Sequence, residues 1–322
     1  TWQVVMFTNI NGFVLFRATL NMEATKDVFR LSNIDPPKMI SLVPYSEAGG
    51  GFFFSYGNSI YNWSYTLHNH TLGLENNGDI TSFHHTSPDK LIVSDGHLVS
   101  LYRQMSANET FTLIKRLVCY KPETDNIGLN NCAQISFSEL GPTAIDYSNP
   151  DILYYAAGSA VHKFNISDPN SNPNMTTQLK FVDTSLGVVT AITLSEDSSH
   201  LFTIQNNNSM QTVRSYDLAS QEMTTTVQLI ETQDQILQAV YLDNGALLCR
   251  SNGGTLLLLN TYTGHFSTVV KGTTYLPCDS SECGQNPIKV RYLTNLQGQG
   301  VHLLYGVDET QKPIALHCNS EY

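Results

Sequence analysis

The sequence is poor in charged residues and has no long apolar run. Only 14% of its 322 residues are charged, and 28 acidic residues against 17 basic ones give a formal net charge of −11. Without a run of Lys and Arg to offset this charge, the chain would be repelled by nucleic acids and anionic membranes. No stretch reaches about 18 consecutive apolar residues, so the sequence predicts no membrane-spanning segment. We therefore expect that the chain does not bind nucleic acid and does not insert directly into a membrane.

The signatures of common enzyme classes are also missing. There is no Gly-x-Ser-x-Gly nucleophile turn, phosphate-binding loop, dinucleotide fingerprint or His-Glu-x-x-His motif. The pair His84-His85 could form a metal or acid–base site, but we favour its interpretation as a polar strand end. Residues Asp168–Asn174 resemble a calcium loop but lack its Gly and bidentate acid, which favours a polar hairpin loop. The sequence therefore predicts no enzymatic activity, cofactor or metal.

Cysteines are few but even in number, and all six are disulfide candidates: Cys119, Cys132, Cys249, Cys278, Cys283 and Cys318. The spacing favours a local loop closed by Cys119 and Cys132. Cys278 and Cys283 could pair with each other, or each could pair with Cys249 or Cys318. A zinc site is the weaker alternative, because there is no Cys-x-x-Cys and no His at ligand spacing beside a cysteine pair.

Six Asn-x-Ser/Thr triplets are candidate N-glycosylation sites, and they begin at Asn62, Asn69, Asn108, Asn165, Asn174 and Asn207. The first residue is Thr1, which is typical of a trimmed chain or of a mature chain whose signal peptide has been removed. The triplets and the low charge together favour a eukaryotic secretory origin. We expect a secreted or extracellular glycoprotein, and any anchor would lie beyond Tyr322.

The sequence does contain a repeated pattern. Residues Leu242–Phe266 consist of a turn, an apolar run, a glycine turn, a second apolar run and another turn. Six copies of this pattern lie at Met39–Trp63, Ile80–Leu101, Ala144–Phe164, Val189–Tyr216, Ala239–Leu259, which overlaps the segment just described, and, more loosely, Ile288–Leu316. Polar turns at such short spacing indicate antiparallel hairpins. The copies start about 40 to 65 residues apart, close to the spacing of propeller blades.

The apolar patterns fit the layers of a propeller blade. Inner strands are buried on both faces and form dense apolar runs, as at Leu153–Tyr155, whereas an outer strand alternates, as at Glu222–Ile230. No helical stripe longer than two turns competes. We expect an all-β chain that forms one β-propeller over residues 1–322. Seven four-stranded blades are favoured, six are the alternative, and a β-sandwich array is the competing fold. A strand such as Trp2–Phe7 would close the ring by pairing with the C-terminal strands.

Three segments resemble blades of the WD40-like and YVTN-like propellers: the turn and strand at Ser87–Val93, the similar Asn149–Tyr155, and Leu259–Gly264 with its sequence LNTYTG. The Trp-Asp dipeptide of true WD40 repeats is absent, since the two tryptophans are Trp2 and Trp63, so no specific family is assigned. Among secreted propellers, this resemblance implies ligand or partner binding more often than catalysis.

The positions of the glycosylation triplets predict an interaction surface. All six lie between residues 62 and 207, and none lies in 1–61 or 208–322, which would be neighbours in a closed ring. Because glycans are bulky and hydrated, they mark surface that is not used for tight protein contact. We predict that the arc built from 1–61 and 208–322 meets a protein partner or another copy, with chance clustering as the alternative. The insertions Lys121–Glu139 and Lys271–Pro287 are candidate recognition loops.

The function predicted from these features is binding. A non-enzymatic secreted or cell-surface glycoprotein would bind a protein or glycan partner in adhesion, in receptor recognition or as the ectodomain subunit of a complex. The alternative is a self-assembling structural subunit of an extracellular fibre or coat. A second alternative is a propeller hydrolase or lactonase, for which the sequence shows no converging set of Asp, Glu and His.

Overall fold

The structure is a computed structural model of the 322-residue chain. It describes residues 2–8, 12–18, 24–30, 42–45, 51–56, 59–64, 70–71, 80, 82–87, 90–95, 98–104, 111–120, 133–135, 140–167, 177–207, 210–229, 234–242, 245–253, 255–270, 288–296, 301–308 and 313–319. Side chains are described mainly between residues 80 and 268. Nearly all of the described elements are β-strands, which confirms the predicted all-β class. Among these residues, no helix has the length and apolar character to cross a membrane.

The described strands form seven sheets, which we number sheet 1 to sheet 7 in chain order. Sheet 1 consists of β1 (Trp2–Thr8), β2 (Gly12–Ala18) and β3 (Ala24–Arg30). Sheet 2 consists of β4 (Leu42–Tyr45), β5 (Gly51–Tyr56), β6 (Ser59–Ser64) and β7 (His70–Thr71). Sheet 3 consists of β8 (Ser82–Ser87), β9 (Lys90–Ser94), β10 (Leu98–Arg103), β11 (Thr112–Tyr120) and β12 (Ala133–Ile135).

The later sheets follow the same plan. Sheet 4 consists of β13 (Leu140–Ile145), β14 (Ile152–Ala157), β15 (Ala160–Asn165) and β16 (Thr177–Gln178). The short 3-10 helix η2 (Thr184–Leu186) leads into sheet 5, which consists of β17 (Val188–Leu194), β18 (His200–Asn207), β19 (Met210–Asp217) and β20 (Glu222–Leu229). Sheet 6 consists of β21 (Ile236–Tyr241), β22 (Ala246–Ser251), β23 (Leu256–Asn260) and β24 (Phe266–Val270). Sheet 7 consists of β25 (Ile288–Leu296), β26 (Val301–Asp308) and β27 (Pro313–Asn319).

The repeated pattern corresponds to these sheets. Each of the six copies overlaps the first three strands of one sheet, from sheet 2 to sheet 7, and Val189–Tyr216 includes most of β17 to β19. Consecutive strands pair antiparallel, as the hairpin turns predicted. The exception is β12, which pairs parallel to β11 with Val118 opposite Ala133. The seven described sheets have three, four or five strands each, and β25 of sheet 7 contacts β4 of sheet 2 directly, so the number of blades, seven or six, stays a prediction.

A β-bulge recurs near the start of the first strand in four successive sheets. In β17 the register shifts between Val189 and Ala191, and in β21 it shifts between Ile236 and Gln238. Comparable shifts occur in β13 and β25. A bulge inserts a residue and bends the strand. Its repetition at the same place shows that sheets 4 to 7 are copies of one structural unit.

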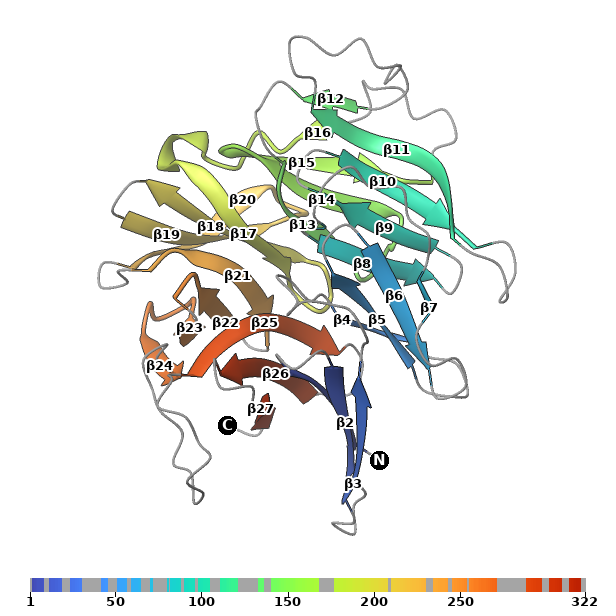
Figure 1. The fold of residues 1–322 in the computed structure, drawn as a ribbon. Helices are drawn as coiled ribbons and strands as arrows, with labels where there is room; N and C mark the ends of the chain where they lie inside the picture. The colour runs from blue at the N-terminus through green and yellow to red at the C-terminus, as the bar shows by residue number, and fades with distance from the viewer. Residues whose placement is uncertain are drawn as a thin grey trace.

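The sheets follow one another around a common centre, with the blue first sheet beside the red last one (Figure 1). First strands of successive sheets are in contact from β8 through β13, β17 and β21 to β25. β25 also contacts β4, and β1 contacts β26 and β27. Sheets from the two ends of the chain are therefore neighbours. A single domain over 1–322, and closure of the ring by pairing between N-terminal and C-terminal strands, stay predictions.

The core consists of apolar layers between neighbouring sheets. Because residues alternate along a strand, β18 directs Leu201 into the layer between sheets 4 and 5 and Phe202 into the layer between sheets 5 and 6. All six residues of β14 are buried, whereas β20 alternates toward solvent, as predicted for inner and outer strands. Burying one such large apolar side chain contributes about 1.5–3 kcal/mol. These layers fix the strand ends that carry the polar turns.

Candidate functional site

The ends of sheets 4, 5 and 6 share a surface of tight turns, which we call the turn face. It contains the β13–β14, β17–β18 and β21–β22 turns and the turns that follow β15, β19 and β23. The turns of sheets 4 and 5 are joined, because the backbone N–H groups of Tyr147 and Ser148 donate to Ser198 Oγ at 2.8 and 3.2 Å. Ser198 is buried and has a positive φ of 56°. Its hydroxyl therefore joins two sheets from a backbone conformation that few side chains adopt.

Three equivalent residues, Asn165, Asp217 and Asn260, hold the turns within each sheet. Each Oδ1 accepts the backbone N–H of the residue two positions later, at 2.9 to 3.1 Å. The residue after each donates its N–H to the neighbouring turn of the same sheet, to Asp151, Ser199 and Gly245 respectively. A short side chain with an oxygen acceptor is what this turn requires.

Asn165 is also the first residue of a predicted glycosylation triplet, and its geometry suits that role. Its side chain is exposed, and Oδ1 accepts from both Ser167 N at 3.1 Å and Ser167 Oγ at 2.8 Å. The carbonyl oxygen alone serves the turn. The amide nitrogen, which would carry the sugar, is not used in these bonds. The turn can therefore persist when Asn165 is glycosylated.

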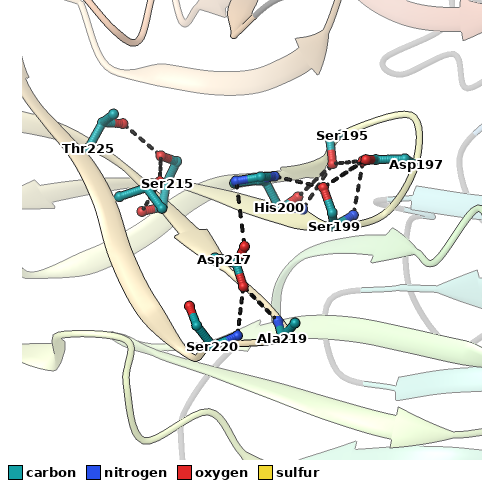
Figure 2. A network of polar contacts seen from close by, with 10 residues as sticks. Ser195, Asp197, Ser199, His200, Ser215, Asp217, Ala219, Ser220 and Thr225 are labelled. Carbon is teal, nitrogen blue, oxygen red and sulfur yellow. Dashed lines mark hydrogen bonds and ion pairs between the residues drawn. The ribbon is translucent and has the colours of Figure 1, made fainter.

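A denser polar network surrounds Asp197 in the β17–β18 turn (Figure 2). Asp197 Oδ1 accepts from Ser195 Oγ at 2.6 Å, from Ser199 N at 3.0 Å and from Ser199 Oγ at 2.8 Å. These hydrogen bonds, first that of the Ser195 hydroxyl and then those of Ser199, lower the pKa of Asp197 to about 2. The carboxylate is therefore charged at neutral pH and organises the turn.

The same network brings together a serine, a histidine and an aspartate. His200 Nδ1 lies 2.7 Å from Ser199 Oγ, and His200 Nε2 lies 4.0 Å from Asp217 Oδ2. A nucleophilic serine would give its proton to the imidazole. Here the Ser199 hydroxyl donates to both carboxylate oxygens of Asp197, so the hydrogen at His200 Nδ1 points toward the serine oxygen. These contacts describe a turn cap and give no support for a nucleophile–base pair.

His84, one of the two histidines singled out above, lies on β8 and joins sheets 3 and 4. Its Nε2 is 2.8 Å from Thr143 Oγ1, which is also 2.7 Å from Ser82 Oγ. Burial lowers the pKa of His84 to about 4, so the ring is neutral at neutral pH. The side chain of His85 lies outside the described residues. Where side chains are described, no group of three or more His, Cys, Asp and Glu residues is placed to hold a metal ion.

The opposite end of sheets 5 and 6 carries loops anchored by two glutamines. Gln205 Nε2 donates to Asp183 O at 2.7 Å, and Gln211 Nε2 donates to Asp234 O at 2.8 Å. Asp183 also accepts from Arg214 Nη1 at 2.8 Å. Hydrogen bonds from Ser185 lower the pKa of Asp183 to about 2, and Arg214 adds to this effect. The loop enters β17 through Gly187, where φ is +89° and a Cβ would come within 2.1 Å of Asn206 O.

The predicted glycosylation sites are only partly described. Asn165 ends β15 at the turn face, and the exposed Asn207 ends β18 at the opposite end of the sheets. Asn62 lies in β6 opposite His70, with no description of its side chain. The other three sites, Asn69, Asn108 and Asn174, lie outside the described residues, as does the 168–174 loop.

The disulfide prediction is wrong for Cys249. Cys249 is a free thiol, fully buried on β22 in the apolar layer between sheets 5 and 6, and burial raises its pKa to about 12. Backbone pairing between β11 and β12 places Cys119 opposite Gln134 and Val118 opposite Ala133. Cys132 comes directly before Ala133 in the chain. Cys318 of β27 lies opposite His302 of β26. The side chains of Cys119 and Cys318, and all of Cys132, Cys278 and Cys283, lie outside the described residues, so their pairing stays a prediction.

The candidate recognition loops are largely outside the described residues. Of Lys121–Glu139, the structure describes β12, and it describes no residue of Lys271–Pro287. Sequence reasoning also missed Gln205, Gln211 and Arg214. The available signal was a polar residue at a strand position whose neighbours along the chain are buried.

The overall arrangement resembles solved structures. The WD40 β-propeller domain of Doa1 matches with a TM-score of 0.62 and 10% identity, over 99% of this chain and 90% of that chain. In all, 1010 chains of solved structures match. No protein-family model and no curated protein matches the sequence. At 10% identity the likeness shows the fold alone. The chain therefore has a WD40-like β-propeller fold.

Proposed function

We propose that this chain is a secreted or cell-surface glycoprotein without enzymatic activity that binds a protein or glycan partner. The contact surface is the arc built from residues 1–61 and 208–322. Contacts of β25 with β4, and of β1 with β26 and β27, support the proposal. They make the two ends of the chain neighbours, as a continuous arc requires.

The geometry of Asn165 carries the glycoprotein part of the proposal. Its Oδ1 serves the turn while its amide nitrogen is left for a sugar. Asn207 lies at the other end of the neighbouring sheet. Sugars at both positions would cover both ends of sheets 4 and 5. Tight contact would then be directed toward the arc, which lacks glycosylation triplets.

Tyr262 is the candidate contact residue in the described part of the arc. It lies at the tip of the turn after β23, is 70% exposed, and covers Gly245 with its ring. Exposed aromatic side chains are enriched among residues that dominate binding energy. Its N–H donates to Asn260 Oδ1, as Ser167 N–H donates to Asn165 Oδ1.

This equivalence supplies a precise test. Tyr262→Ser converts residues 260–262 into an Asn-x-Ser triplet on the same turn that carries the native triplet at Asn165. A glycan at Asn260 should reduce binding to a protein or glycan partner, or self-association, at least tenfold, because a bulky hydrated group blocks close contact. Binding of the secreted, glycosylated variant is measured against partner candidates by surface plasmon resonance, and self-association is measured by light scattering.

Two matched variants separate the causes. Tyr262→Ala removes the ring without creating a triplet, and Asn165→Asp removes a glycan outside the arc while keeping the oxygen that serves the turn. If Tyr262→Ser carries a confirmed sugar at Asn260 and still associates as before, the proposal that the arc is the contact surface would be contradicted. Loss of ordered fibres or oligomers of the chain itself would favour the structural-subunit alternative over a separate partner.

A further inference from the structure

Three buried polar groups gather between sheets 4 and 5. The side chains of Thr203 and Gln205 are completely buried, and Arg214 is partly buried. Thr203 Oγ1, Gln205 Oε1 and Arg214 Nε each have less than 1 Å² of exposed surface and make no hydrogen bond to the protein. Buried polar atoms nearly always have a partner, because leaving one without any costs free energy.

The three groups belong to one place in the fold. Thr203 and Arg214 are directly opposite each other on β18 and β19, so their Cα atoms are about 5 Å apart. Gln205 follows on the same face of β18, because alternate residues of a strand point the same way. Leu201 and Tyr216, the next pair on that face, belong to the same buried apolar cluster as Val161 of sheet 4 and Leu179, which follows sheet 4. The Arg214 guanidinium and the Gln205 amide both donate hydrogen bonds to Asp183, so these two groups lie close together.

We infer that this cluster binds ordered water between sheets 4 and 5. Arg214 Nε–H donates, Gln205 Oε1 accepts, and the Thr203 hydroxyl can do either. A cation would face the guanidinium, and an anion would face the amide oxygen and the nearby Asp183 carboxylate. Water both donates and accepts, and a buried water typically makes about three hydrogen bonds to such groups. It would fix the side chains of Gln205 and Arg214, which hold the Asp183 loop to sheet 5.

The inference is tested by whether one substitution raises or lowers the melting temperature. Thr203→Val keeps the side-chain shape and removes the hydroxyl. If water is bound there, the variant removes one of its partners, and the melting temperature should fall by about 2 °C. If the interface is dry, the variant removes a buried hydroxyl that has no partner, and the melting temperature should rise, which would overturn the inference.

Thr261→Val is the matched control. Thr261 is equally buried, but its hydroxyl donates directly to Gly245 O at 2.7 Å, so this variant should melt lower in either case. A high-resolution crystal structure of the unmodified chain gives a second readout. A density peak within hydrogen-bond distance of Arg214 Nε and Gln205 Oε1 would support the site. A direct hydrogen bond between these two atoms, with no peak, would overturn it.

Discussion

Gln205 and Gln211 anchor loops in the same way but on opposite faces of sheet 5. On the face toward sheet 6, Gln211 satisfies both ends of its amide, donating to Asp234 O and accepting from Ile236 N at 2.6 Å. On the face toward sheet 4, Gln205 donates to Asp183 O, but Oε1 has no partner in the protein. The two interfaces are built from the same repeat but satisfy their buried polar groups differently. Between sheets 5 and 6 the glutamine makes direct hydrogen bonds at both ends of its amide, whereas between sheets 4 and 5 it leaves an oxygen that water can satisfy.

The largest expected effect comes from removing these two amides. Gln211→Met would leave Asp234 O and Ile236 N without their partner, and should lower the free energy of unfolding by about 2–4 kcal/mol. Gln205→Met removes the bond to Asp183 O together with an oxygen that no protein group satisfies, and should cost about 1–2 kcal/mol. Urea unfolding of both variants measures the difference. Equal losses would show that the two interfaces are equivalent.

A smaller effect compares the turns of sheets 5 and 6. The turns that begin at Asp217 and Asn260 both end on a left-handed residue, Gln221 with φ 62° and Gly264 with φ 72°. Because a side chain is strained there, Gln221→Gly should stabilise the protein by about 0.5–1 kcal/mol.

The reverse change is the control for this turn. Gly264→Gln should destabilise by a similar amount. A Cβ at Gly264 would lie 3.6 Å from the nearest atom of Val227, so the cost is conformational and not steric. The two variants are compared by thermal unfolding. Stabilisation by Gly264→Gln would contradict the equivalence of the turns.

The sequence predicts the fold well because its signals are local. The polar turns and apolar runs of Val189–Tyr216 define a hairpin without knowledge of any distant contact, and the structure confirms them. The bulge at Thr190 has no such signal, because it depends on how β17 is bent against its neighbours. The same limit applies to Ser198, which in sequence is one serine among several and in the fold joins two sheets.

Side-chain roles at the candidate sites depend on contacts across sheets. Cys249 counts toward an even set of cysteines in the sequence, but its strand position directs the thiol into an apolar layer. Gln205 and Arg214 are far from Asp183 along the chain and meet it only when β18 and β19 are paired. Asn165 is the case in which both levels agree. The triplet marks a candidate glycosylation site, and the turn leaves the amide nitrogen available.

Glycopeptide mass spectrometry of the protein purified from its natural source tests the central claim most directly. We predict sugar on Asn165 and Asn207, at opposite ends of sheets 4 and 5, and none on any asparagine of 1–61 or 208–322. Unmodified Asn165 and Asn207 in that material would contradict the proposal that glycans shield these sheets and direct partners to the arc.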